Sequence, residues 1–192
     1  MDFAAYREVF PVTQHGVYLN NAAETPLNTR VRQRLEEYLQ VASDAPQDKP
    51  SVRHAVRAAL SDLFGGAPED YALVTSTGVG VGIAAAGYHW QPGDNVVMPA
   101  DEHWNSTFPW LRLRQRGVDV RLVPPDANQR ILPEAIAARV DNHTRIVATT
   151  AVRFNTGFRA NLKALSEIAH SAGALFLVDG IQATGVIPLN VQ

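Results

Sequence analysis

The 192-residue chain contains no cysteine, which excludes disulfides, thiolate metal sites and a cysteine nucleophile within these residues. Its lysines are only Lys49 and Lys163. The chain also has no large excess of positive or negative charge. Its formal net charge of −2 creates no field that would attract nucleic acid or an anionic membrane. No segment approaches the roughly 18 apolar residues of a membrane span, and residues 1–8 lack a signal-peptide core. These absences predict a cytoplasmic protein with no membrane or nucleic-acid partner.

The composition of the chain is typical of a globular protein, with 46% hydrophobic and 19% charged residues. From residue 71 onward, short β-rich runs alternate with helical patterns. This alternation predicts a doubly wound α/β fold, in which helices cover both faces of a mostly parallel sheet. The expected strands are Tyr71–Thr75, Asn95–Met98, Val118–Val123, Arg145–Thr150 and Ala174–Val178. The expected helices that follow them are Val79–Tyr88, Ser106–Arg116, Ile131–Val140 and Leu162–Ala172.

A helical segment precedes the α/β region. An amphipathic helix is expected over Leu27–Val41 and another over Ser51–Phe64, with the polar linker Ser43–Pro50 between them. The second helix ends at a glycine pair, a common helix stop. We therefore predict an N-terminal helical segment of residues 1–65 and an α/β domain of residues 66–192.

An aspartate stands at the end of the most hydrophobic expected strand, in the segment Leu177–Gly185. Ligands of open parallel sheets bind at the carboxyl ends of strands, and burying the Asp179 carboxylate there is costly without a cationic or hydrogen-bonding partner. A pyridinium nitrogen is such a partner, because the carboxylate would keep its proton in place. Gln182 could then reach a phenolic oxygen on the same ring. The alternative is that Asp179 only caps a turn or helix.

Small residues join an expected strand to the following helix at Ser76–Gly80. Free backbone N–H groups and the helix dipole at such a turn can face a phosphate, and glycine allows close approach. Thr77 and the backbone of Gly78 and Val79 are the candidates for this role. Close packing of strand and helix is the alternative explanation of the same small residues.

A histidine follows the next strand, within the segment Asp101–Trp110. The flat imidazole of His103 could stack on an aromatic cofactor ring and fix its orientation. Trp104 is the rival for this role, and a purely structural histidine is the alternative. Near the same rim, Asn155 is a weaker cofactor candidate, and Arg159 is expected to fix the structure of its loop.

The order of these segments resembles the class V aminotransferases, a family of pyridoxal 5'-phosphate (PLP) enzymes. The family includes cysteine desulfurases, kynureninases and isopenicillin N epimerase-like proteins, and the run Asn155–Leu162 is most similar to the epimerase-like subgroup. The resemblance covers nearly the whole chain. Its matching segments are Val17–Leu27, Thr75–Gly80, Asp101–Trp110, Asn155–Leu162 and Leu177–Gly185.

The resemblance implies an aspartate aminotransferase-like large domain, PLP as cofactor, an amino-acid substrate and a homodimer. No metal site is expected. The family usually has threonine or serine at the position of Gly78, so one phosphate contact is expected to be lost. The implied cofactor-binding residues are Thr77, Gly78, Val79, His103, Asn155, Asp179 and Gln182, and the implied substrate-side residues are Asn21 and Ala22.

PLP enzymes hold the cofactor as a Schiff base with a lysine, which in this family follows the Asp-x-x-Gln motif by roughly two dozen residues. That position would fall after Gln192. Lys49 lies in the polar linker and Lys163 on an outer helix face, so neither is expected to replace it, and no catalytic residue is assigned. The family's small C-terminal domain is also absent. We expect an N-terminal portion, with an incomplete large domain.

Two functions follow from these observations. The first is an enzyme acting on an amino acid, as an epimerase, a lyase or desulfurase, or an aminotransferase. The alternative is a non-catalytic PLP-binding or subunit-pairing module left by truncation. A general nucleotide-binding α/β protein is disfavoured, because the chain has neither a G-x-G-x-x-G turn after a strand nor a Walker motif.

Overall fold

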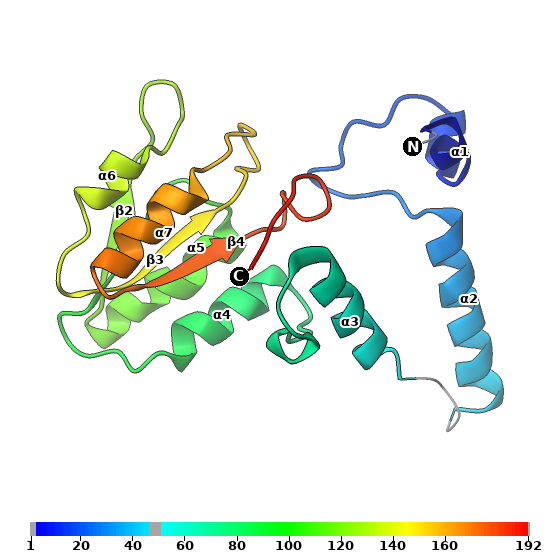
Figure 1. The fold of residues 1–192 in the computed structure, drawn as a ribbon, viewed down its shortest axis with the longest axis horizontal. Coiled ribbons are helices and arrows are strands. Elements are labelled where there is room, and N and C mark those ends of the chain that lie inside the picture. Colours follow the sequence, from blue (N-terminus) through cyan, green and yellow to red (C-terminus); the bar gives the residue numbers. More distant parts are fainter. Residues whose placement is uncertain (1–2, 47–50, 192) are drawn as a thin grey trace. The chain divides into compact units, whose positions relative to one another are not determined.

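The computed structural model describes residues 3–46 and 51–191, so the expected linker lies partly, and Lys49 wholly, outside the described residues. The chain divides into two compact units, Met1–Ala59 and Leu60–Gln192. Its helices and strands are drawn in Figure 1. In the first unit these are α1 (Phe3–Glu8), the 3-10 turn η1 (Pro11–Gln14), α2 (Thr29–Asp44) and most of α3 (Arg53–Phe64).

The helix α2 begins where the sequence offers an N-cap. The Asn28 Oδ1 accepts a hydrogen bond from the Val31 N–H at 2.9 Å, which satisfies one of the free donors of the first turn. Ion pairs one turn apart, such as Arg32–Glu36 at 2.8 Å, line the polar side. The helices α1, α2 and α3 contain no buried residue among those described.

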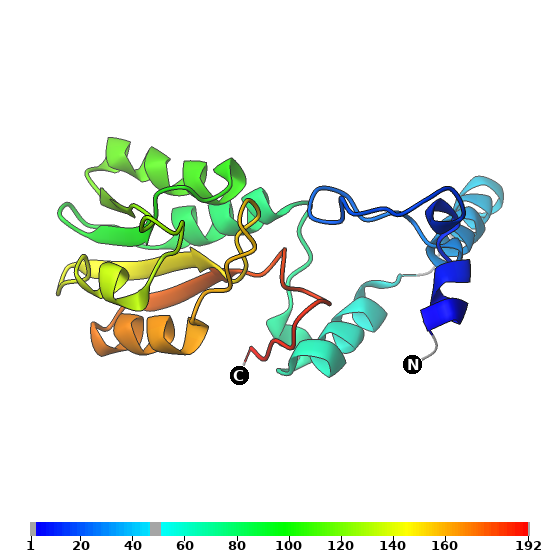
Figure 2. The same cartoon turned by 90° about the horizontal axis from the view of Figure 1, so that it is seen from above.

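The second unit is an open parallel sheet between two helical layers (Figure 2). Its strand order is β2-β1-β3-β4, and every neighbouring pair is parallel. This architecture confirms the predicted α/β fold class. Its elements are η2 (Pro68–Asp70), α4 (Thr77–Gly87), β1 (Asn95–Pro99), α5 (Trp104–Leu111), η3 (Arg112–Arg116), β2 (Asp119–Val123), α6 (Pro133–Ala137), β3 (Thr144–Thr150), α7 (Leu162–Ser171) and β4 (Leu175–Asp179).

Alternation along β1 explains why helices are needed on both faces. Val96 and Met98 belong to the core formed with α4 and α5, whereas Val97 belongs to the core formed with α6 and α7. Successive side chains of a strand point to opposite faces. A strand that buries apolar side chains on both of its faces therefore requires a covering layer on each side.

The predicted strand Tyr71–Thr75 is wrong. These residues are extended but belong to no strand, and Leu73 and Val74 are 46% and 44% exposed. A strand exists only by hydrogen bonding to a neighbour, and the part of the chain that the structure describes places no strand beside this segment. The predicted helix Ile131–Val140 is also too long, because α6 begins at Pro133 and ends at Ala137.

A polar network fastens the amino ends of the strands. Asp141 accepts hydrogen bonds from the Asn95 amide (2.9 Å), the His143 N–H (2.9 Å) and Arg121 Nη1 (2.6 Å). The Arg121 side-chain hydrogen bond and then the Asn95 bond hold the pKa of the Asp141 carboxyl well below its usual range. Asn95 is fully buried, so its amide depends on this acceptor.

We expect Asp141→Ala to destabilise the second unit by about 1–3 kcal/mol at pH 7, because it leaves the buried Asn95 amide without an acceptor. The folded pKa lies below the unfolded one, so the carboxylate stabilises the fold above about pH 4 and this contribution is lost as the pH falls further. Urea unfolding between pH 7 and pH 3 should give a flatter acid dependence for the variant. Asp62→Ala, at an exposed position, is the control.

Candidate cofactor site

The carboxyl ends of the strands form the candidate site. The strand order reverses between β1 and β3, since the chain adds β2 on one side of β1 and β3 on the other. Ligands of open α/β sheets bind at the carboxyl edge beside such a reversal. Asp101 and Glu102 follow β1 there, Arg153 follows β3, and Asp179 ends β4.

An open cavity of about 480 Å³ brings two of the predicted site residues together. Thr77 lines it from the first turn of α4, and Asp179 lines it from the end of β4. Its volume lies within the roughly 300–1,000 Å³ of small-molecule sites. The other lining residues are Gly80, Val81, Leu177, Val178, Gly180, Ile181 and Thr184.

The amino end of α4 is an N-capped helix start with backbone donors in its first turn. Ser76 is the N-cap, and its Oγ accepts a hydrogen bond from the Val79 N–H at 3.2 Å. The N–H groups of Thr77 and Gly78 belong to the first helical turn, whose donors have no acceptor within the helix. A phosphate at this end of the helix would also meet the positive end of the helix dipole.

Asp179 is buried, with 8% of its surface exposed. Its Oδ1 accepts a hydrogen bond from the Ile181 N–H at 3.0 Å, and its Oδ2 accepts one from the Ser106 hydroxyl. Donors of this kind stabilise a carboxylate in its ionised form. Because Asp179 also lines the open cavity, it presents a negative charge to whatever binds there.

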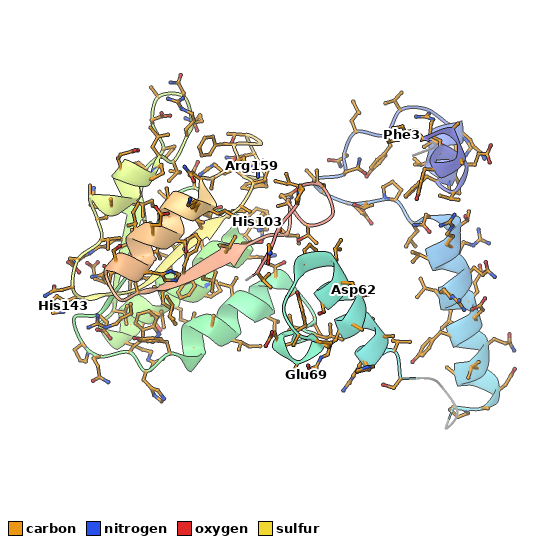
Figure 3. All side chains as sticks on the ribbon, viewed as in Figure 1. Phe3, Asp62, Glu69, His103, His143 and Arg159 are labelled. Carbon is orange, nitrogen blue, oxygen red and sulfur yellow. The ribbon has the colours of Figure 1, made fainter. Side chains whose placement is uncertain are left out.

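His103 lies at the start of α5, where its Nδ1 accepts a hydrogen bond from the Asn105 N–H at 3.3 Å. Its ring centroid lies 4.2 Å from that of Trp104, and the Phe154 ring meets it edge-on at 5.2 Å. Figure 3 shows His103 and His143 at opposite ends of the α/β unit. His103 is thus at the carboxyl edge, although it is not among the residues that line the cavity with Thr77 and Asp179.

The loop that carries His103 is tied to the end of β3 by two acidic residues. Asp101 forms an ion pair with Arg153, whose Nη2 also donates to the Asp101 carbonyl at 3.2 Å. The Glu102 carboxylate accepts hydrogen bonds from the Thr150 N–H at 3.2 Å and from the Thr150 hydroxyl. Burial raises the pKa of the Glu102 carboxyl, against the lowering effect of the Thr150 hydrogen bonds.

The remaining predicted residues lie in different places. Gln182 follows β4 in the turn after Asp179 and is partly buried, whereas Asn155 is exposed in the turn after β3. Asn21 and Ala22 belong to an exposed turn of the first unit. Lys163 is exposed on α7 and is not among the residues lining the 480 Å³ cavity.

Sequence reasoning missed Ser106, Glu102 and Thr150 as parts of the site. Ser106 and Glu102 stand in the segment that carries His103, but only the fold shows that one contacts Asp179 and the other contacts Thr150. Thr150 is the register partner of Asp179 in the adjacent strand. One sequence signal could have identified Thr150, because it ends an expected strand just as Asp179 directly follows another.

Among the described residues, no helix is both long and apolar enough to cross a membrane. In the same part of the chain, no three histidine, aspartate or glutamate side chains are grouped so that they could hold a metal ion.

Fold and site together define an α/β protein in which Thr77, from the first turn of α4, and the buried Asp179 line one open cavity. The family model of the class V aminotransferases (Aminotransferase class-V) matches residues 17–192. A probable cysteine desulfurase of Methanothermobacter thermautotrophicus is 31% identical over 97% of this chain and 48% of its own length. The cysteine desulfurase CsdA of Escherichia coli is 29% identical over 98% of this chain and 51% of its own length.

Solved structures agree with this relation at the level of the fold. The crystal structure of Escherichia coli CsdA superposes with a TM-score of 0.88 at 24% identity, covering 98% of this chain and 51% of its own. The apo cysteine desulfurase of Thermococcus onnurineus superposes with a TM-score of 0.86 at 22% identity, covering 98% and 50%. A C-DES mutant, which has glycine covalently linked to its PLP cofactor, superposes with a TM-score of 0.85 at 22% identity, covering 96% and 51%.

This chain belongs to the class V aminotransferase family, and it spans about half the length of the curated relatives that it matches. The family relation indicates PLP as the cofactor, which confirms the expectation from the sequence. The described residues fit that group: free donors of the α4 first turn suit its phosphate, and the buried Asp179 carboxylate suits its ring nitrogen.

Proposed function

We propose that this chain supplies the cofactor-binding part of a PLP-dependent enzyme that acts on an amino acid. One observation carries the proposal: Thr77 and Asp179, from elements about a hundred residues apart in the chain, line the same cavity. The first turn of α4 offers phosphate donors, and Asp179 offers an anion. PLP carries both a phosphate and a basic ring nitrogen, and so matches both groups.

Each side chain has a distinct role in this proposal. Asp179 holds a proton on the pyridine nitrogen, because it lines the cavity and its carboxylate is oriented by hydrogen bonds from the Ser106 hydroxyl and the Ile181 N–H. His103 covers one face of the ring, and Gln182 hydrogen-bonds the phenolic oxygen. When bound, the protonated ring of PLP accepts electron density from a substrate carbanion.

For the reaction we propose a group of amino-acid chemistries. The relatives named cysteine desulfurases support a lyase or desulfurase, and the run Asn155–Leu162 supports an epimerase-like reaction or an aminotransferase.

Further residues complete the proposed site. Residues 1–65, with Asn21 and Ala22, contribute the substrate side, and Asn155 is a further cofactor contact. Lys163 is not proposed as the cofactor anchor, because it is not among the residues lining the cavity. The complete protein is proposed to be a cytoplasmic homodimer.

Titration of the chain with PLP tests the proposal. We expect saturable binding, seen as a change in PLP absorbance and in tryptophan fluorescence. Borohydride treatment followed by mass spectrometry should find no reduced adduct on Lys163. Absence of saturable binding would overturn the proposed function, and a stoichiometric adduct on Lys163 would show that Lys163 is the cofactor anchor.

A substitution in the turn Ser76–Gly80, the proposed phosphate site, is expected to raise the affinity for PLP. A Cβ added at Gly78 would lie 3.6 Å from the nearest Asn105 atoms, an ordinary contact, so the position has room for a Cβ. We expect Gly78→Ser to tighten PLP binding roughly 3- to 10-fold, because its hydroxyl adds a phosphate hydrogen bond worth about 0.5–1.5 kcal/mol. The measurement is the dissociation constant from the same titration.

Gly82→Ser is the matched control for this substitution. Gly82 lies in the same helix, one turn further on, and a Cβ there meets nothing within 4 Å. This variant gains the same helix propensity, but its added hydroxyl lies outside the turn Ser76–Gly80. Equal effects of the two substitutions on PLP affinity would contradict a phosphate contact at position 78.

A further inference from the structure

The loop Asp101–His103, which leads from β1 to α5, is held at the end of β3 by side-chain contacts. Each of its three residues contacts a residue at or just after that strand end. The pairs are Asp101–Arg153, Glu102–Thr150 and His103–Phe154. The segment that presents His103 therefore depends on side chains from a distant part of the sequence, across 48 positions for the Glu102 pair and 52 for the Asp101 pair.

Arg153 is the buried end of the first pair. Its side chain is 2% exposed, whereas that of Asp101 is 30% exposed. Its Nη2 forms the ion pair and also donates to the Asp101 carbonyl at 3.2 Å. In the part of the chain that the structure describes, its Nε and Nη1 have no hydrogen-bond partner. A buried cation requires a compensating charge, and Asp101 supplies it, so the position of Asp101 is tied to that of the guanidinium.

The backbone of Arg153 is fixed as well. Its N–H donates to the Phe158 carbonyl at 3.0 Å, and its carbonyl accepts a hydrogen bond from the Gly157 N–H at 2.9 Å. Gly157 has a φ of 69°, in the left-handed region that favours glycine, which allows the chain to turn back at this point. Both backbone groups of Arg153 are therefore used within one turn, and its side chain extends from a fixed point.

His103 stands at the other end of the loop, two residues after Asp101. Its ring meets the Phe154 ring edge-on, with an interplanar angle of 88° and a centroid distance of 5.2 Å. Phe154 directly follows Arg153 and is itself 43% exposed, so little other packing fixes its position. Displacement of Arg153 would therefore disturb both the loop that carries His103 and the ring that His103 contacts.

We propose that Arg153 is a positioning residue for His103. Through Asp101 it fixes the loop before α5, and through its chain neighbour Phe154 it fixes the ring beside the imidazole. The consequence for PLP rests on the proposed function, in which His103 covers one face of the cofactor ring. Loss of the Arg153–Asp101 pair removes this cover and leaves the contacts of Thr77 and Asp179 in place.

A double-mutant analysis of PLP binding tests this role. We expect Arg153→Met to weaken PLP binding about 2- to 10-fold, the worth of one aromatic stacking contact. In a His103→Ala background, the same substitution should cause a further loss of less than about 2-fold, because the contact that Arg153 positions is already gone. Equal losses in the two backgrounds would overturn the positioning role, and so would full PLP affinity of a folded Arg153→Met chain.

Arg121→Met is the matched control. Arg121 also pairs with aspartates, Asp119 at 2.7 Å and Asp141 at 2.6 Å, but at the amino ends of the strands. This variant should lose stability and keep its PLP dissociation constant within about 2-fold of the parent chain, because its site is remote from the carboxyl edge. A loss of affinity equal to that of Arg153→Met would reduce the effect of Arg153 to general stability and overturn the inference.

A measurement without PLP tests the positioning of His103 directly. The ring-proton NMR signals of His103, identified by their loss in His103→Gln, are shifted by the neighbouring rings of Trp104 and Phe154. We expect Arg153→Met to move these signals and Arg121→Met to leave them in place.

Asp101→Asn breaks the same ion pair from its more exposed side, so it replaces Arg153→Met if that variant does not fold. It should move the His103 signals in the same direction. Unmoved signals in both variants would overturn the inference. Absence of PLP binding by the parent chain would contradict only the proposed function, because the NMR signals still report the position of His103.

Discussion

Replacing Asp179 with alanine is expected to weaken PLP binding about 10- to 150-fold. The reason is the loss of a charge-assisted hydrogen bond to the ring nitrogen, which contributes roughly 1.5–3 kcal/mol. Asp179 lines the open cavity, is 8% exposed and has its charge supported by two donors. The measurement is the PLP dissociation constant from absorbance titration, with circular dichroism to confirm that the variant folds.

A matched aspartate separates this effect from a general loss of negative charge. Asp62 lies on α3 and is exposed, and it is labelled in Figure 3. Asp62→Ala should leave the dissociation constant within about 2-fold of the parent chain, because exposed charges are screened by salt within roughly 10 Å. A folded Asp179→Ala chain with unchanged PLP affinity would show that Asp179 is only a turn-capping residue.

Replacing Trp110 with alanine is expected to cost about 3–5 kcal/mol of unfolding free energy, the largest effect that we predict. Trp110 is 1% exposed and packs in the core between the sheet and the helices α4 and α5. It also lines a small cavity of about 10 Å³ together with Asp179, so its loss would enlarge that cavity. Urea unfolding monitored by circular dichroism measures the change, and full unfolding of the variant would be consistent with it.

Trp104 is the matched control, because it is a tryptophan of the same helix and is 60% exposed. Trp104→Ala should cost less than about 1 kcal/mol, since it removes little buried area and one aromatic contact with His103. Similar losses for the two variants would contradict the packing of α5 against the sheet.

Much of the fold was predictable from local pattern. The expected strands from Asn95 onward and the helices between them occur in the structure with shifts of a few residues at most of their ends. Each of these signals depends on residues near one another in the chain, such as the continuous apolar run of β4. The exception, Tyr71–Thr75, has a strand-like composition but no strand partner among the described residues.

The candidate site was predictable only in part. Thr77 and Asp179 were identified because a helix start and a strand end are local signals, and the parallel topology then places both at one edge. Ser106, Thr150 and Glu102 were missed, because their roles arise from contacts across 48 and 73 positions of the chain. Whether a hydroxyl contacts a carboxylate so far away in the sequence depends on strand register, and short-range sequence patterns do not predict that register.

By itself, the sequence determined the α/β class, the family and the residue types available for PLP. Periodicity, turn residues and the order of short motifs are visible in the amino-acid sequence alone. The tertiary structure alone decided that Thr77 and Asp179 line one cavity and that the Ser106 hydroxyl donates to Asp179. The physical reason is that burial and pairing of charges depend on which strands are neighbours, and strand order and register are long-range outcomes of packing.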